Sequence, residues 1–201
     1  MDLPPFSVTW DYLCPFARNV HEHLITGLEN GAAWEVTFTP FSLMQAHVEE
    51  GGAPVWDAPD QAKGVLALQA GLVVRDRFPD RFLAAHRALF AARHDQSLDL
   101  NDRAVVSDAL EASGVPSDTV WKEIGEGWPL QALRAAHEES VSRHEVFGVP
   151  TFVVGDQAVF VRVMTRPEGN GELARRTIDR VLDLVNGHPE INEYKHTTIP
   201  R

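Results

Sequence analysis

The chain has 201 residues, of which 44% are hydrophobic and 23% charged, a balance typical of a globular protein. Its net charge of −11 argues against a nucleic-acid partner, because phosphate binding needs a dense basic face, and also against an acidic membrane surface. The single cysteine, Cys14, excludes an intramolecular disulfide and a multi-cysteine zinc site, and we expect no metal site. No apolar run approaches the roughly 20 residues that span a bilayer, and the first ten residues have no signal-peptide pattern. We therefore expect a cytoplasmic protein.

The first forty residues predict a strand, a helix and a second strand. Residues 5–10 alternate between apolar and polar side chains, and residues 15–28 follow helical spacing. Residues 34–41 alternate again, and Pro40 closes this segment. This order favours two parallel strands joined by a right-handed crossover.

The middle of the chain reads as helix, and the strand signal returns near the end. The expected helices cover residues 61–78, 80–93, 101–113, 117–126 and 130–147, with Asp80, Asn101 and Ser117 as N-caps. Residues 151–154 and 158–163 flank the turn-forming Gly155-Asp156-Gln157 and predict a hairpin. A last helix follows over residues 172–185, and residues 188–201 form a polar tail.

This order of elements predicts an α/β fold, βαβ followed by ββα, with a helical insertion between the two halves. The insertion spans residues 59–147, whereas residues 1–58 and 148–187 form one domain around a shared sheet.

The first candidate functional motif is Cys14-Pro15 at the start of the predicted first helix. Proline is favoured at the first helical position, so Cys14 is the expected N-cap. There the free amides of Phe16 and Ala17 and the helix dipole favour thiolate, which predicts a thiol pKa below the free value of about 8.5. Asp11 would oppose this ionisation or fix the turn by accepting amide hydrogen bonds. The alternative is a buried cysteine that acts as a small apolar residue.

The second motif is Gly148-Val149-Pro150-Thr151, just before the hairpin. Alone it also suits an ordinary trans proline at a helix–strand junction. Together the two motifs resemble the DsbA-like branch of the thioredoxin superfamily, which includes kappa-class glutathione transferases and 2-hydroxychromene-2-carboxylate isomerases. The resemblance implies a thioredoxin-like fold, a cis peptide bond before Pro150, and substrate contact through the Val149 backbone.

The resemblance also implies a nucleophilic Cys14, with Pro15, Phe16, Val149, Pro150 and Thr151 around the substrate. Arg18, one turn beyond Cys14, is a further candidate for binding a thiolate or a carboxylate; a solvated helix residue is the alternative. Dithiol relatives carry a second cysteine where Ala17 stands, and kappa-like relatives usually have serine at the Cys14 position. The Asp-Arg pair that those isomerases often show after the hairpin is missing here, which puts a conventional glutathione site in doubt.

We therefore expect a monothiol oxidoreductase that uses Cys14 with a low-molecular-weight thiol and has no tightly bound cofactor. Glutathione is one candidate thiol. The chain also looks similar to actinobacterial DsbA-like proteins, which implies mycothiol as another. A kappa-like transferase or isomerase, in which Cys14 only holds a bound thiol, and a non-catalytic binding protein remain alternatives. The partner is a small thiol or disulfide, and a homodimer stays open.

The histidines are weaker candidates. His21 and His23 lie two residues apart on the first predicted helix and point to different sides, so they make a poor metal pair. His137 and His144 are two turns apart, and most histidines in such positions lie on the surface.

Overall fold

The computed structural model describes residues 4–198 and contains one four-stranded mixed sheet. Its strands are β1 (Phe6–Trp10), β2 (Val36–Pro40), β3 (Thr151–Val154) and β4 (Gln157–Phe160), arranged in the order β2-β1-β3-β4. β1 pairs in parallel with β2 and antiparallel with β3, and β3 and β4 form the hairpin. The predicted βαβ and ββα halves therefore share one sheet, as a thioredoxin-like fold requires.

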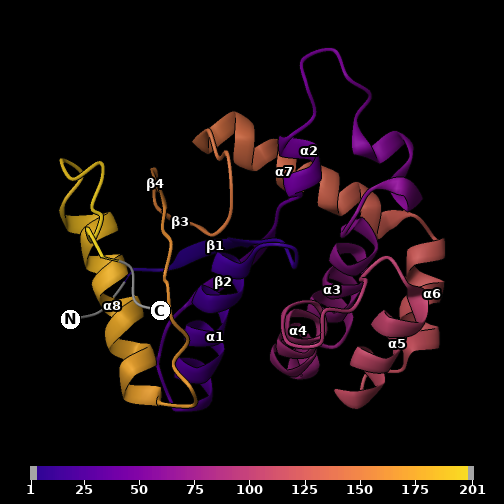
Figure 1. The fold of residues 1–201 in the computed structure, drawn as a ribbon, viewed down its shortest axis with the longest axis horizontal. Coiled ribbons are helices and arrows are strands. Elements are labelled where there is room, and N and C mark those ends of the chain that lie inside the picture. Colours follow the sequence, from indigo (N-terminus) through magenta and orange to yellow (C-terminus); the bar gives the residue numbers. More distant parts are fainter. Residues whose placement is uncertain (1–3, 199–201) are drawn as a thin grey trace.

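Two long helices accompany this sheet, α1 (Pro15–Glu29) and α8 (Gly171–Gly187), and they pack side by side (Figure 1). α8 buries the apolar stripe that the sequence predicts, Ile178, Val181, Leu182 and Val185. Residues 188–198 have no helix or strand and are exposed, which agrees with a polar tail. The last part of the predicted tail, residues 199–201, lies outside the described residues.

The insertion consists of helices, as predicted. They are α3 (Val65–Arg77), α4 (Pro79–His94), α5 (Arg103–Ala112), α6 (Ser117–Gly125) and α7 (Trp128–His144). The sequence did not predict the short α2 (Leu43–Ala46) or the single 3₁₀ turns Val55–Asp57 and Pro59–Gln61 that come before α3. No helix within residues 4–198 is long and apolar enough to cross a membrane.

The sequence placed each of the three predicted N-caps of the insertion one or two residues away from the N-cap in the structure. α4 begins at Pro79, whose fixed φ suits the first helical position, so Phe78 and not Asp80 is the N-cap. The α5 cap is Asp102, whose carboxylate accepts the Ala104 amide at 2.8 Å. Asn101 instead accepts the Gly64 amide across the fold.

The third misplaced cap is Ser117, which is the first residue of α6 and follows the N-cap Pro116. The Ser117 amide donates to the Glu111 carboxylate at 2.8 Å. A glutamate of the preceding helix therefore satisfies this helix terminus, and local sequence does not reveal such a partner.

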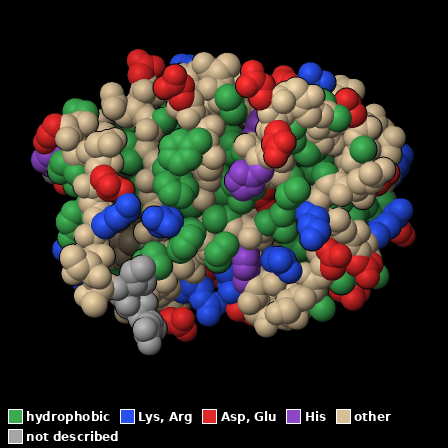
Figure 2. All heavy atoms as spheres, turned by 45° about the horizontal axis from the view of Figure 1, so that its top comes forward, with side chains coloured by type: hydrophobic (Ala, Val, Ile, Leu, Met, Phe, Trp, Pro, Cys, Tyr) green, Lys and Arg blue, Asp and Glu red, His purple; other side chains and the backbone are tan. Residues whose placement is uncertain are grey.

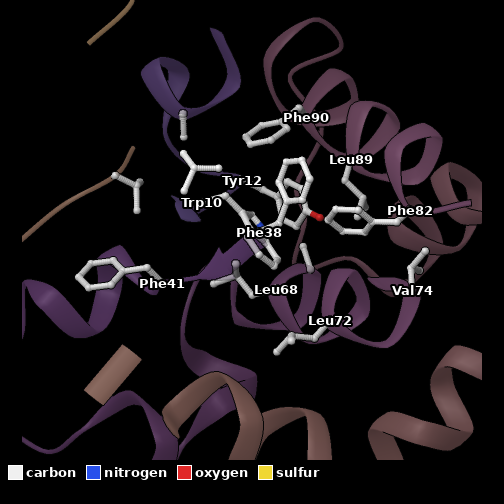
Figure 3. Close-up of a cluster of buried hydrophobic side chains, with 14 of the residues drawn as sticks. Trp10, Tyr12, Phe38, Phe41, Leu68, Leu72, Val74, Phe82, Leu89 and Phe90 are labelled. Carbon is white, nitrogen blue, oxygen red and sulfur yellow. The ribbon is translucent and has the colours of Figure 1, made fainter. Parts of the chain in front are cut away.

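One continuous core joins the sheet to the insertion. Trp10 at the end of β1 and Tyr12 just beyond it are fully buried. The Trp10 ring meets Phe82 of α4 edge to face, and the Tyr12 ring meets Phe90 of α4 in the same way (Figure 3). Such aromatic pairs each add about 0.5–1.5 kcal/mol beyond the area they bury. The helical insertion is thus anchored directly to the loop that leads to Cys14.

Candidate functional site

Cys14 is the N-cap of α1, as the sequence predicts. Its backbone is extended (φ −91°, ψ 118°), Pro15 is the first helical residue, and the Ala17 amide donates to the Cys14 Sγ at 3.4 Å. Pro15 is exposed and Phe16 is half-buried. The sulfur therefore lies against the positive end of α1, next to side chains that reach the surface.

The Gly148-Val149-Pro150-Thr151 loop lies directly against this sulfur. The Val149–Pro150 peptide bond is cis, and the Cys14 thiol donates to the Val149 carbonyl oxygen at 3.2 Å. The Thr151 amide donates to the Thr9 Oγ1 at 2.8 Å, which ties the loop to β1. Two segments about 135 residues apart in sequence are thus held around one thiol.

The predicted depression of the thiol pKa is wrong. Burial raises the pKa of Cys14, and this effect outweighs the amides of Ala17 and Phe16, which lower it; the Asp11 carboxylate raises it further. Only 7% of the Cys14 surface is exposed, so solvation of a thiolate is poor. The resting group is therefore a neutral thiol that donates to a carbonyl oxygen, and an anion at this position would need help from its reaction partner.

Asp11 both opposes ionisation of Cys14 and fixes the turn before it. Its two carboxylate oxygens accept the amides of Leu13 at 2.9 Å and Leu43 at 2.8 Å. The residue is fully buried, and burial raises its pKa to about 6 in spite of these two bonds. Asp11 thereby joins the loop that carries Cys14 to the start of α2.

Arg18 is buried and does not behave as a solvated helix residue. Its side chain is 8% exposed and forms an ion pair with Asp95, which also lies 3.6 Å from Arg166. The Arg18 Nε has no hydrogen-bond partner within residues 4–198. A third cation, Arg162, lies over the Phe16 ring at 5.3 Å. Basic groups therefore gather beside the first turn of α1, but the main partner of Arg18 is a carboxylate of the same chain.

A buried chain of hydrogen bonds lies behind the site, and its central residue escaped the sequence analysis. The Tyr12 hydroxyl lies 2.8 Å from the His86 Nδ1, the His86 Nε2 lies 2.9 Å from the His21 Nδ1, and the His21 Nε2 lies 3.1 Å from the Thr9 carbonyl oxygen. A carbonyl oxygen only accepts, so each neutral ring has one defined tautomer and protons point from Tyr12 toward Thr9. The spacing Phe82, His86, Phe90 on α4 was the available signal that His86 faces the core.

The other histidines are placed as follows. His23 is buried on a different side of α1 from His21, where its Nε2 lies 3.0 Å from the Thr165 carbonyl oxygen. His137 is only 5% exposed, so its expected place on the surface is wrong. Within residues 4–198 no group of three histidine, cysteine, aspartate or glutamate side chains is arranged to hold a metal ion.

The strand order is that of a thioredoxin-like protein, and so is the position of the Cys14 thiol, which lies at a helix N-terminus and faces the loop that contains Pro150. The DSBA-like thioredoxin domain family matches residues 7–165, most of the chain. The chain therefore belongs to this family. No curated protein matches it.

Solved structures share the fold at low sequence identity. BdbD from Bacillus subtilis is 15% identical with a TM-score of 0.59, over 91% of this chain and 90% of that one. MdbA from Actinomyces oris, a thiol-disulfide oxidoreductase, is 16% identical with a TM-score of 0.57, over 99% of this chain and 83% of that one. A thioredoxin-like oxidoreductase from Silicibacter pomeroyi is 17% identical with a TM-score of 0.56, over 88% of this chain and 85% of that one. At this identity the likeness concerns the fold.

Proposed function

We propose that the protein is a cytoplasmic monothiol oxidoreductase that exchanges disulfides of low-molecular-weight thiols at Cys14. The observation that carries this proposal is the position of the Cys14 Sγ, 3.4 Å from the Ala17 amide and 3.2 Å from the Val149 carbonyl oxygen. A nucleophilic sulfur at this position has amide donors on one side and a backbone acceptor on the other. Membership of the DSBA-like family supports the same chemistry.

The proposed reaction has two exchange steps. Cys14 attacks one sulfur of a disulfide, its S–H bond breaks, and a Cys14–S–S–R mixed disulfide forms while the other thiol leaves with the proton. A second small thiol then attacks the mixed disulfide, forms a new small disulfide and returns the proton to Cys14. No external oxidant is required, because each step breaks one S–S bond and forms another.

The partner thiol has to come from outside the chain. Ala17 occupies the position where a resolving cysteine would stand, and Cys14 is the only cysteine in the sequence. Glutathione and mycothiol are the candidate partners, and the proposal includes no tightly bound cofactor. The raised pKa of Cys14 implies that the leaving thiolate draws the proton away as it departs, since little thiolate exists beforehand.

The direct test is to trap the mixed disulfide. The protein is incubated with glutathione disulfide or mycothiol disulfide, quenched in acid and measured by intact mass, with Cys14→Ser as the matched control. We expect one adduct on the native chain, none on the control, and release of the adduct when the reduced thiol is added. If no adduct forms with either disulfide at millimolar concentration and neutral pH, covalent exchange is not the function.

A kappa-like transferase or isomerase is the second candidate, and a specific observation favours it. The resting Cys14 is a neutral hydrogen-bond donor, which is the form needed to hold the thiolate of a bound thiol. Under this alternative Cys14→Ser keeps measurable turnover, because a hydroxyl also donates a hydrogen bond. Under the covalent proposal Cys14→Ser abolishes turnover.

A non-catalytic binding protein is the third candidate, and the 7% exposure of Cys14 is the observation behind it. It predicts neither an adduct nor turnover with any thiol. A homodimer is a separate proposal, which sedimentation of the purified chain would test.

A further inference from the structure

A hollow whose lining does not include Cys14 lies between α2, the segment before α3 and the middle of α7. Its volume is about 400 Å³, within the range of small-molecule sites. The residues that line it are Gln45, Pro54, Trp56, Arg134, His137, Glu138, Val141 and Ser142. Figure 2 turns the top of Figure 1 toward the viewer and shows hydrophobic side chains and histidines on this face, with acidic and basic side chains among them. Neither Cys14 nor the Val149–Pro150 loop belongs to this lining.

The polar group at the wall of this pocket is the His137 imidazole. The residue is 5% exposed, its ring packs on Phe41 with the centroids 4.2 Å apart, and the Trp56 ring meets it edge to face at 5.6 Å. The His137 Nδ1 lies 3.3 Å from the Ser42 amide nitrogen. Because a backbone amide only donates, Nδ1 accepts, and the ring proton is on Nε2. No protein acceptor bonds this Nε2–H within residues 4–198, and it is not one of the fully buried atoms that lack a partner, so it meets solvent at the pocket.

The other polar groups of the lining also leave donors free. The Gln45 Oε1 accepts the Val55 amide at 2.9 Å, which fixes the orientation of the side-chain amide and leaves its NH₂ group unused. The Glu138 carboxylate accepts from the Arg134 Nε at 2.7 Å, so the one acidic group of the lining is already paired. Burial lowers the pKa of His137 to about 4, so the ring stays neutral and keeps its donor near pH 7.

The pocket therefore combines an aromatic and aliphatic wall with two neutral donors, beside the ion pair of Arg134 and Glu138. We infer that it binds a small planar aromatic molecule that presents a carbonyl oxygen to the His137 Nε2–H and the Gln45 NH₂ group. Trp56, Pro54 and Val141 supply the apolar surface for the ring. A ligand that supplies an acceptor exchanges the water at these donors for a hydrogen bond inside a partly apolar pocket, which gives a modest net gain. This site is independent of the thiol chemistry proposed for Cys14.

The test uses two probes that differ only in the acceptor, 1-indanone and indane. Binding to the full chain is measured by ligand-observed NMR, and the ¹⁵N resonances of the His137 ring are followed in the same titration. We expect 1-indanone to bind about two- to tenfold more tightly than indane, the range that one net hydrogen bond provides. The Nε2 resonance should move and the Nδ1 resonance should stay.

Variants at the two donor residues distinguish the loss of a hydrogen-bond donor from the loss of the folded site. Gln45→Glu keeps the oxygen that accepts from Val55 but replaces the free donor by an acceptor, so it should weaken 1-indanone and leave indane unchanged. His137→Gln can place an amide donor near the Nε2 position, whereas the shorter side chain of His137→Asn places its amide near Nδ1 and does not reach the Nε2 position. The glutamine variant should therefore retain more of the preference for 1-indanone than the asparagine variant.

The outcomes are decisive in both directions. Equal affinity for the two probes, or a preference that Gln45→Glu does not change, would overturn the inference, and so would the absence of binding at millimolar probe. Cys14→Ser should bind 1-indanone as the native chain does. Failure of the thiol-exchange proposal is thus distinguished from failure of this one.

Discussion

Gly71 in α3 provides a sharp test of how the insertion packs against the loop before Cys14. A Cβ atom placed on Gly71 would lie 2.4 Å from the Tyr12 hydroxyl oxygen and 3.1 Å from the ring carbons beside it. Tyr12 is fully buried, and its hydroxyl is bonded to the His86 Nδ1. Gly71→Ala therefore requires the tyrosine to move and the bond to His86 to break.

The magnitudes decide the sign of this substitution. Replacing glycine by alanine inside a helix is worth about 1 kcal/mol in favour of alanine. Overpacking a tight core costs about 1–3 kcal/mol, and leaving the His86 ring nitrogen unsatisfied costs about another 1–3 kcal/mol. Gly71→Ala should therefore lower the free energy of unfolding by about 1–5 kcal/mol, measured by urea denaturation.

The control for Gly71→Ala is Gly125→Ala at the end of α6. Gly125 is exposed, and a Cβ atom there meets nothing within 4 Å. This control should be neutral or slightly stabilising. A second test is the double variant with Tyr12→Phe, which removes the clashing oxygen and should be less destabilised than the sum of the two single variants. If Gly71→Ala is as stable as Gly125→Ala, the packing described here is wrong.

Three further predictions concern ionisation. Iodoacetamide labelling of Cys14 should have a midpoint above about 8.5, because burial raises the thiol pKa, and a midpoint at or below that value contradicts the site described here. Asp11→Asn should move that midpoint down, since Asp11 contributes to the rise, whereas no change would show that its charge is unimportant. Burial lowers the pKa of both His21 and His137 to about 4. As the pH falls below about 6.5, these side chains therefore become protonated in the unfolded chain before they do in the native state, and the native state loses stability. Asp11, with its pKa raised to about 6, acts in the opposite direction. His86 is also fully buried, and burial holds its pKa well below the usual value, so it adds to the loss. Urea denaturation should therefore show a net loss of at least about 2 kcal/mol between pH 7 and pH 5, and constant stability would refute this assignment.

Local patterns predicted the elements that bury one simple face. The alternation before Trp10, the helix after Cys14-Pro15 and the apolar stripe of α8 each appear where the sequence placed them. The helix starts in the insertion were harder, because Ser117 is satisfied by Glu111 and Asn101 by Gly64. Such partners are brought together only by tertiary packing.

The electrostatics of the site could not be derived from the sequence. The position of Cys14 at a helix N-terminus predicted a lowered pKa, and that contribution is present in the Ala17 and Phe16 amides. Its opponent, burial under the loop at Val149, depends on residues from the far end of the chain. The same holds for Arg18, whose partner Asp95 follows the end of α4.

The order of the strands has a consequence for a chain that is still being synthesised. β1 is an inner strand only because β3, encoded about 140 residues later, covers the edge that β2 leaves open. A nascent or truncated chain that ends before Val149 therefore presents β1 as an unpaired edge, and it also leaves Cys14 without the Val149 carbonyl. Exposed edges invite pairing with other chains. Shortened forms of this protein should then be prone both to aggregation and to premature modification of their only thiol.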